Sequence, residues 1–259
     1  MQRPLALVTG ASSGIGLELA RQFAEHGFDL LINAEDEAIG AAADQLRGSG
    51  AQVEPVRADL RTHAGVEQLY DAVARAGRPL EAAALNAGVG QGGAFVDEDL
   101  ADELAVVDVN VRSTVHLAKR VLTDMNARNH GKVLITSSIA STMPGPYNAV
   151  YNASKSFLQS FAEALQTELK DTDITVTSLM PGPTDTEFFE RADLEDTMLG
   201  QGKKDDPAEV AKEGFEALMS GKPRVVAGSF KNKAQAAMGR VLPDSAKSAM
   251  HGKMSKPQE

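Results

Sequence analysis

The sequence lacks cysteine and tryptophan and has only three tyrosines in 259 residues. Without cysteine there are no disulfides, no thiolate nucleophiles and no cysteine-bound metal sites. No run of about 18 apolar residues is present, so no membrane-spanning helix is expected. The start, residues 1–5, enters a strand at once and lacks the apolar stretch of a signal peptide. We therefore expect a cytoplasmic protein with no integral membrane association.

Basic residues are also scarce relative to acidic ones. The chain has 26 Lys and Arg against 36 Asp and Glu, a net charge of −10, which argues against nucleic acid as the main partner. With 42% hydrophobic and 24% charged residues, the composition is that of an ordinary globular protein. No metal site is expected, because the five histidines show no ligand spacing: His26, His63, His116, His130 and His251.

Short apolar runs alternate with amphipathic stretches along the chain. We expect strands at 5–8, 29–32, 53–56, 82–85, 133–135, 175–179 and 223–227. We expect helices at about 14–26, 36–47, 65–76, 100–127, 151–169 and 207–219. Such alternation predicts an α/β protein with a parallel, doubly wound sheet. No linker divides the chain, so a single domain over 1–259 is expected.

Two regions do not follow the alternation. Residues 182–206 predict a long loop over the substrate site, with a short helix near 187–191. The basic segment 230–259 predicts a docked helix, and its last residues, 253–259, are expected to be frayed. The helical spacing there is carried by Phe230, Ala234, Ala237, Met238, Val241 and Leu242. That helix would dock on its own or a sister subunit; binding to a membrane surface or a partner is the weaker alternative.

Three glycines, Gly10, Gly14 and Gly16, follow the first strand and open the first helix. At such a turn glycines let the backbone approach a pyrophosphate, and the helix N-terminus supplies N–H donors. The spacing, Gly-x-x-x-Gly-x-Gly, differs from the commoner Gly-x-Gly-x-x-Gly. The alternative is a turn whose glycines serve tight packing alone, but the strand-then-helix context favours a nucleotide site.

Tyr151 precedes Lys155 by four residues, and Ser138 lies thirteen residues before the tyrosine. On a helix this spacing places tyrosine and lysine on one face. An ammonium about 4 Å away interacts by roughly 4 kcal/mol at an effective dielectric near 20, about three pKa units, which would bring a tyrosine near 7. This is an upper limit because burial opposes ionisation. The alternative is a surface tyrosine beside a solvated lysine, which leaves Ser138 unexplained.

These motifs, with Asn86-Ala87-Gly88 and Pro181-Gly182, resemble the short-chain dehydrogenase/reductase family, in its branch of about 250 residues. The resemblance runs from Leu5 to about Thr186. It implies a Rossmann-like domain with a mostly parallel seven-stranded sheet and helices on both faces. It also implies an NAD(P)-dependent oxidoreductase that interconverts a carbonyl and a secondary alcohol by hydride transfer. A dinucleotide-binding sensor without turnover is the alternative, since fold does not dictate function.

The resemblance assigns roles to individual residues. Tyr151 would be the general acid/base, Lys155 would lower its pKa and hold the ribose, and Ser138 would bind the substrate oxygen. Asn110 would steady a helix and a proton-relay water. The cofactor would contact Gly10, Ser12, Ser13, Gly14, Ile15, Gly16, Glu35, Asp59, Leu60, Asn86, Ala87, Gly88, Tyr151, Lys155, Pro181, Gly182 and Thr186.

The choice between NAD and NADP is made near the end of the second strand, where an acid takes the ribose hydroxyls or a base takes a 2′-phosphate. Residues 32–37 contain Glu35, Asp36 and Glu37 and no Lys or Arg, and Ser13 is neutral. Three carboxylates would repel a phosphate, so NAD is preferred over NADP. The alternative is that these acids complement the dipole of the next helix.

The substrate is expected to be small and largely apolar. The side chains that would form its pocket are Ile139, Met143, Pro144, Tyr147, Phe188 and Phe189. Residues 88–93 are expected to form a flexible loop beside it. By the resemblance, the helices at 100–127 and 151–169 pair between subunits in a homodimer or homotetramer.

Overall fold

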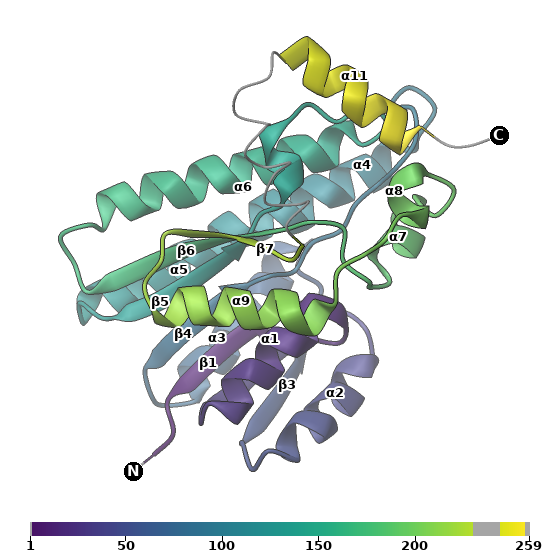
Figure 1. Ribbon diagram of the computed structural model, residues 1–259. Coiled ribbons are helices and arrows are strands. Elements are labelled where there is room, and N and C mark those ends of the chain that lie inside the picture. Colours follow the sequence, from purple (N-terminus) through teal and green to yellow (C-terminus); the bar gives the residue numbers. More distant parts are fainter. Residues whose placement is uncertain (1, 230–243, 257–259) are drawn as a thin grey trace.

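The computed structural model describes residues 2–229 and 244–256. Within them, seven strands form one sheet in the order β3-β2-β1-β4-β5-β6-β7, with every neighbouring pair parallel (Figure 1). The strands are β1 (Leu5–Thr9), β2 (Asp29–Ala34), β3 (Val53–Arg57), β4 (Leu80–Leu85), β5 (Gly131–Thr136), β6 (Ile174–Pro181) and β7 (Arg224–Ala227). The predicted doubly wound sheet is therefore confirmed.

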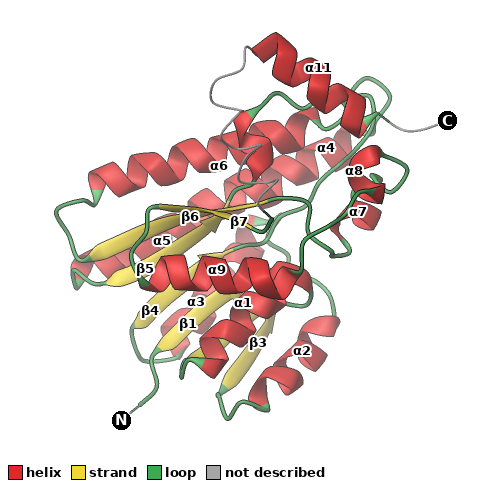
Figure 2. Ribbon diagram, viewed as in Figure 1, coloured by secondary structure: helices red, strands yellow, loops and turns green. Residues whose placement is uncertain are grey.

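Helices cover both faces of this sheet (Figure 2). One layer contains α1 (Gly14–Glu25), α2 (Ala38–Arg47) and α9 (Pro207–Met219). The other contains α3 (His63–Arg75), α5 (Thr114–Ala127) and α6 (Ala149–Glu168). Alternate residues of a strand point to opposite faces, so in β1 Ala6 and Val8 pack with the first layer, and Leu5 and Leu7 with the second. Burial on both faces explains why most residues of β1 and β2 are apolar.

The helix expected over 100–127 consists of three consecutive pieces. These are α4 (Leu100–Val106), the π-helical η1 (Val107–Ser113) and α5. A π-helical turn holds one more residue than an α-helical turn, and such insertions occur frequently at functional sites. Asn110 lies in the middle of η1 and is fully buried.

The segment between β6 and α9 contains two one-turn helices, α7 (Phe188–Arg191) and α8 (Met198–Gln201). The first of these is the short helix expected near 187–191. Phe189, Ala192 and Leu194 are buried together and form a small hydrophobic cluster that anchors the segment.

The C-terminal helix α11 (Asp244–Ser255) packs on its own chain, near α8 (Figure 1). The helical spacing predicted over 230–242 lies outside the described residues. Residues 253–255, expected to be frayed, belong to α11: Ser255 is fully buried and its hydroxyl contacts His251. In the described part of the chain, no helix is long and apolar enough to cross a bilayer.

Candidate active site

A cavity of about 290 Å³ opens at the carboxyl edge of the sheet. The chain crosses from one side of the sheet to the other between the neighbouring strands β1 and β4, and ligands of doubly wound sheets bind at such a switch point. Every residue assigned above to the cofactor or to catalysis lines this cavity except Asn110. The fold thus brings together segments that are far apart in the sequence.

The glycine turn forms one wall of the cavity. Gly10 has a left-handed backbone (φ +64°), and a Cβ there would lie 2.9 Å from the Cα of Ala87. A Cβ on Gly16 would lie 1.8 Å from the Gly10 carbonyl oxygen, so tight packing does require this glycine. The side chain of Ser13 does not cap α1, which leaves backbone N–H groups of the first turn available to a ligand.

The corner beyond the end of β2 carries Glu35 and Asp36, which both line the cavity. Arg61 forms ion pairs with Glu35 at 3.1 Å and with Asp59 at 2.9 Å. The hydrogen bond from the Arg61 side chain holds the pKa of the Asp59 carboxyl below its usual range. Residues 32–37 contain no base, as the sequence indicates, but the fold places Arg61 beside them.

Ser138, Tyr151 and Lys155 also line the cavity and lie beside one another. Ser138 follows β5 and caps the short 3₁₀ helix η2 (Ile139–Thr142) by accepting a hydrogen bond from the Ala140 N–H at 3.1 Å. Tyr151 and Lys155 lie one turn apart in α6, as their spacing predicts. The Lys155 Nζ lies 5.6 Å from the centroid of the Tyr151 ring and donates to the Thr136 carbonyl at 3.1 Å.

The acidities of this pair differ from the expectation. Burial raises the pKa of Tyr151 to about 12, against a smaller opposing effect of a hydrogen bond with Ser138. Burial also lowers the pKa of Lys155 to about 8. The expected shift of the tyrosine toward 7 is therefore wrong for this structure. Desolvation outweighs the charge because the ammonium lies by the ring and binds the Thr136 carbonyl.

Asn110 lies behind the cavity wall instead of in it. Its side chain accepts from the Val89 N–H and donates to the Val89 carbonyl and to the Ser154 hydroxyl, each at 2.9 Å. These bonds join η1 to α6 and to the loop that follows β4. A Cβ on the neighbouring Gly88 would lie 3.1 Å from the Lys155 Nζ, so the loop passes close to the lysine.

The remaining wall is mostly apolar. Of the expected pocket residues, Ile139, Met143, Phe188 and Phe189 line the cavity, whereas Pro144 and Tyr147 do not. The Phe188 ring lies 5.1 Å from the Tyr151 ring. The loop at 88–93 packs against the segment around α7, because the Gly92 N–H donates to the Ala192 carbonyl at 2.7 Å.

Two residues that the sequence did not suggest also line the cavity, His251 and Met254 of α11. His251 is 4% exposed; its Nε2 lies 3.3 Å from the Asn152 side-chain nitrogen and its Nδ1 lies 3.0 Å from the Ser255 hydroxyl. Burial lowers the pKa of this histidine. Nothing in the local sequence signals this role, because α11 meets α6 only in the folded chain.

The short chain dehydrogenase family model matches residues 4–196. This chain belongs to the short-chain dehydrogenase family. It is 33% identical over 218 residues to the oxidoreductase UcpA of Salmonella typhimurium, covering 82% of this chain and 79% of that protein. The family relationship makes the chain an oxidoreductase enzyme.

Two solved structures show the same fold over nearly the whole chain. A short-chain dehydrogenase/reductase from Burkholderia phymatum in complex with NAD is 25% identical, with a TM-score of 0.84 and coverage of 100% of this chain and 98% of that one. A short-chain dehydrogenase from Sphingobium yanoikuyae in complex with NADPH is 26% identical, with a TM-score of 0.80 and coverage of 99% and 97%. Both cofactors therefore occur among similar structures.

Proposed function

We propose that this chain is an NAD-dependent dehydrogenase/reductase that interconverts a carbonyl and a secondary alcohol on a small, largely apolar substrate. One observation carries the proposal: Ser138, Tyr151 and Lys155 lie beside one another in the wall of the same cavity that the glycine turn lines. The glycines and the uncapped start of α1 fit a pyrophosphate. Similar proteins with bound NAD or NADPH support the nicotinamide cofactor. The proposal treats 1–259 as a single catalytic domain.

Tyr151 would act on the substrate oxygen. When bound, the nicotinamide supplies the hydride for reduction or accepts it in oxidation. In reduction the Tyr151 hydroxyl gives its proton to the carbonyl oxygen, and in oxidation the tyrosinate takes the proton of the alcohol. A pKa of about 12 keeps Tyr151 protonated at neutral pH, in the form that donates. Ser138 would hold the same oxygen by a hydrogen bond.

Lys155 and Asn110 would support this chemistry. The Lys155 ammonium would bind the ribose and favour the tyrosinate when alcohol is oxidised. Asn110 joins three elements around the lysine, so we assign it the positioning of Lys155 and of the loop after β4. By the family resemblance, Asn110 would also steady a proton-relay water.

The preference for NAD over NADP rests on charge. Glu35 and Asp36 line the cavity where the adenosine ribose would lie, and Arg61, which does not line it, is paired with Glu35 and Asp59. A 2′-phosphate in the cavity would meet the carboxylates of Glu35 and Asp36, and no basic side chain of the described residues lines the cavity beside them. Ribose hydroxyls would instead find acceptors.

We also propose a homodimer or homotetramer. Leu100, Leu104 and Val107 are 67%, 51% and 37% exposed and recur along one face of α4 and η1. Phe157 of α6 is 43% exposed. Large apolar side chains on one surface commonly mark an interface. Light scattering on the purified chain tests this, and a monomeric mass would contradict it.

The test of the function is a fluorescence titration with NADH and, in parallel, NADPH, followed by a screen of carbonyl compounds with the tighter cofactor. We expect tighter binding of NADH. Glu35→Gln should weaken NADH and strengthen NADPH several-fold, because one carboxylate facing the ribose is lost. Glu37→Gln is the matched control, since Glu37 pairs with Arg57 and does not line the cavity.

Each outcome separates one part of the proposal. If the wild-type protein bound NADPH more tightly than NADH, the charge argument would be contradicted, but the proposed oxidoreductase activity would not. Binding of a cofactor without turnover of any carbonyl or alcohol would favour a sensor. Binding of neither cofactor would contradict the proposed function.

A further inference from the structure

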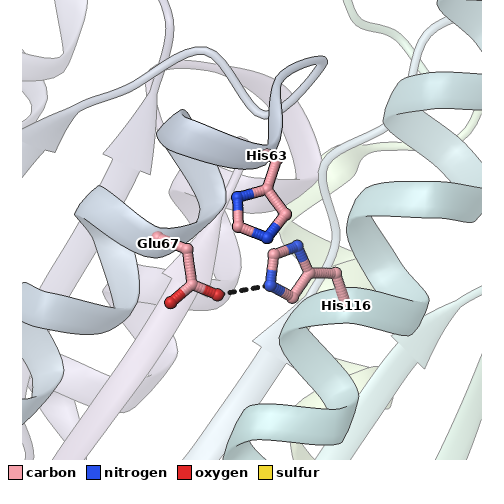
Figure 3. A group of neighbouring side chains, drawn as sticks. All are labelled: His63, Glu67 and His116. Atoms are coloured by element: carbon pink, nitrogen blue, oxygen red, sulfur yellow. Dashed lines mark hydrogen bonds and ion pairs between the residues drawn. The ribbon is translucent and has the colours of Figure 1, made fainter.

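A second group of reactive side chains lies on the helical layer formed by α3 and α5. His63 is the first residue of α3, Glu67 lies one turn later on the same face, and His116 projects from α5 (Figure 3). One ligand atom from each side chain can be chosen so that all three lie within 4.8 Å of one another. None of the three lines the active-site cavity.

The three side chains already contact one another. The two imidazole rings lie 4.6 Å apart between centroids, and Nε2 of His116 forms a short hydrogen bond with Oε1 of Glu67 (Figure 3). The His116 and Glu67 side chains are 20% and 24% exposed, and His63 is exposed. The group is therefore partly shielded and still open to an ion from solvent.

We propose that His63, Glu67 and His116 bind one divalent transition-metal ion of the zinc class. Two imidazole nitrogens and one carboxylate oxygen are donors that suit zinc, whereas magnesium and calcium prefer all-oxygen sites. Three protein ligands leave a fourth tetrahedral position for water. The proposal is independent of the function proposed for the cavity.

Binding requires a small contraction of the site. Ligand distances of about 2.0–2.2 Å place tetrahedral ligand atoms roughly 3.4 Å apart, closer than the present limit of 4.8 Å. Glu67 is held from α3 and His116 from α5, while the exposed His63 ring is free to turn toward them. The ion would replace the hydrogen bond between His116 and Glu67 with bonds to both.

Arg120 limits the affinity and also orients the ligand. Its guanidinium donates to Oε1 of Glu67 at 3.0 Å and to Oε2 at 2.7 Å. These bonds lower the pKa of Glu67, so the carboxylate is ionised at neutral pH. A nearby positive charge repels a dication, so we expect weaker binding than at a closed structural zinc site.

The position of the site gives the ion a structural consequence. The loop that leads into α3 contains Asp59 and Leu60, which line the cavity. Arg112 of η1 donates to the Arg61 carbonyl in the same loop. An ion shared by α3 and α5 would strengthen the connection that Glu67 already makes between these helices through His116 and Arg120.

The experiment is calorimetric titration of Zn²⁺ and of Mg²⁺ into the tag-free, chelator-treated full chain. We expect one Zn²⁺ per chain, no Mg²⁺ binding, and a higher unfolding temperature with Zn²⁺, since a ligand that binds only the folded state stabilises it. His63→Ala and Glu67→Gln should each weaken Zn²⁺ at least about tenfold, because even outer-shell changes weaken metal sites by 10–100-fold.

His130→Ala is the matched control, because His130 pairs with Glu81 at 2.9 Å outside the cluster. It should bind Zn²⁺ as the wild type does. Circular dichroism without metal verifies that each variant is folded. Because two ligand residues are substituted independently, the test still stands if one of the two variants fails to fold. Any of three results would overturn the proposal: no Zn²⁺ binding, equal Zn²⁺ affinity in the ligand variants and the wild type, or one Zn²⁺ bound between two copies of the chain.

Discussion

The residues assigned to the cofactor and those assigned to catalysis are built into the cavity in different ways. The cofactor part is backbone and glycine, in one strand–turn–helix segment, Thr9–Gly16, backed by the loop after β4. The catalytic part is made of side chains from several elements: Ser138 after β5, Tyr151 and Lys155 in α6, and Asn110 in η1. Substitutions in the first part should therefore act through space and backbone strain, and substitutions in the second through proton transfer and charge.

The largest effect is expected from Tyr151→Phe. The change removes the hydroxyl and keeps the ring, so turnover should fall about 10²–10⁴-fold, the range of general acid–base catalysis. NADH affinity should stay close to wild type, because the glycine turn is untouched. Steady-state rates and a cofactor titration measure the two properties separately. Activity close to wild type in this variant would refute the proposed role of Tyr151.

A smaller effect is expected from Gly10→Ala, and it should fall on NADH affinity instead of on turnover. The left-handed backbone (φ +64°) and the approach to the Ala87 Cα should cost about 1–2 kcal/mol, or roughly a tenfold loss of NADH affinity if the strain displaces the turn. Turnover at saturating NADH should change little.

Gly27→Ala is the control for this variant, since Gly27 has φ +85° with open space around it. It carries a similar backbone cost far from the cavity, so it should lower the unfolding temperature and leave NADH affinity unchanged. Equal affinities in the Gly10→Ala and Gly27→Ala variants would show that the turn does not hold the cofactor.

The last prediction concerns how the stability of the folded chain depends on pH through Lys155. Its pKa is lowered from 10.5 to about 8 in the folded chain, so between these values the unfolded state binds more protons. Stability from this group is therefore full above pH 10.5 and is lost as the pH falls toward 8, by on the order of 3 kcal/mol. In the Lys155→Met variant, the increase in stability as the pH rises from 8 to 10.5 should be absent.

Denaturant unfolding of both proteins between about pH 8 and pH 10 measures the difference. The upper limit of pH 10 avoids the ionisation of Tyr151. Above pH 10, Tyr151 loses its proton in the unfolded chain before it does in the folded chain, because folding raises its pKa to about 12. This lowers stability as the pH rises and so opposes the effect of Lys155. Parallel pH profiles for the two proteins would show that Lys155 is not desolvated in the folded chain.

Local patterns predicted the sheet, the glycine turn and the Tyr151–Lys155 pair, because these are encoded within short segments, whereas the rest of the predicted cavity lining came from the family resemblance. The same patterns missed Arg61, which follows β3 and reaches Glu35 only across the sheet edge. The four-residue spacing placed Lys155 near the Tyr151 ring, but it did not give the degree to which the folded chain desolvates the two groups, which decides the pKa of the tyrosine.

The sequence by itself determined the parallel α/β fold, because strand and helix periods lie within short segments, and the resemblance of its motifs to the family identified many of the residues that line the cavity. Only the tertiary structure decided which distant side chains meet. It brings His251 of α11 against α6, and it places His63 and Glu67 beside His116, 49 residues away from Glu67. The physical reason is that contacts between elements depend on how whole helices pack, and no local pattern records that packing.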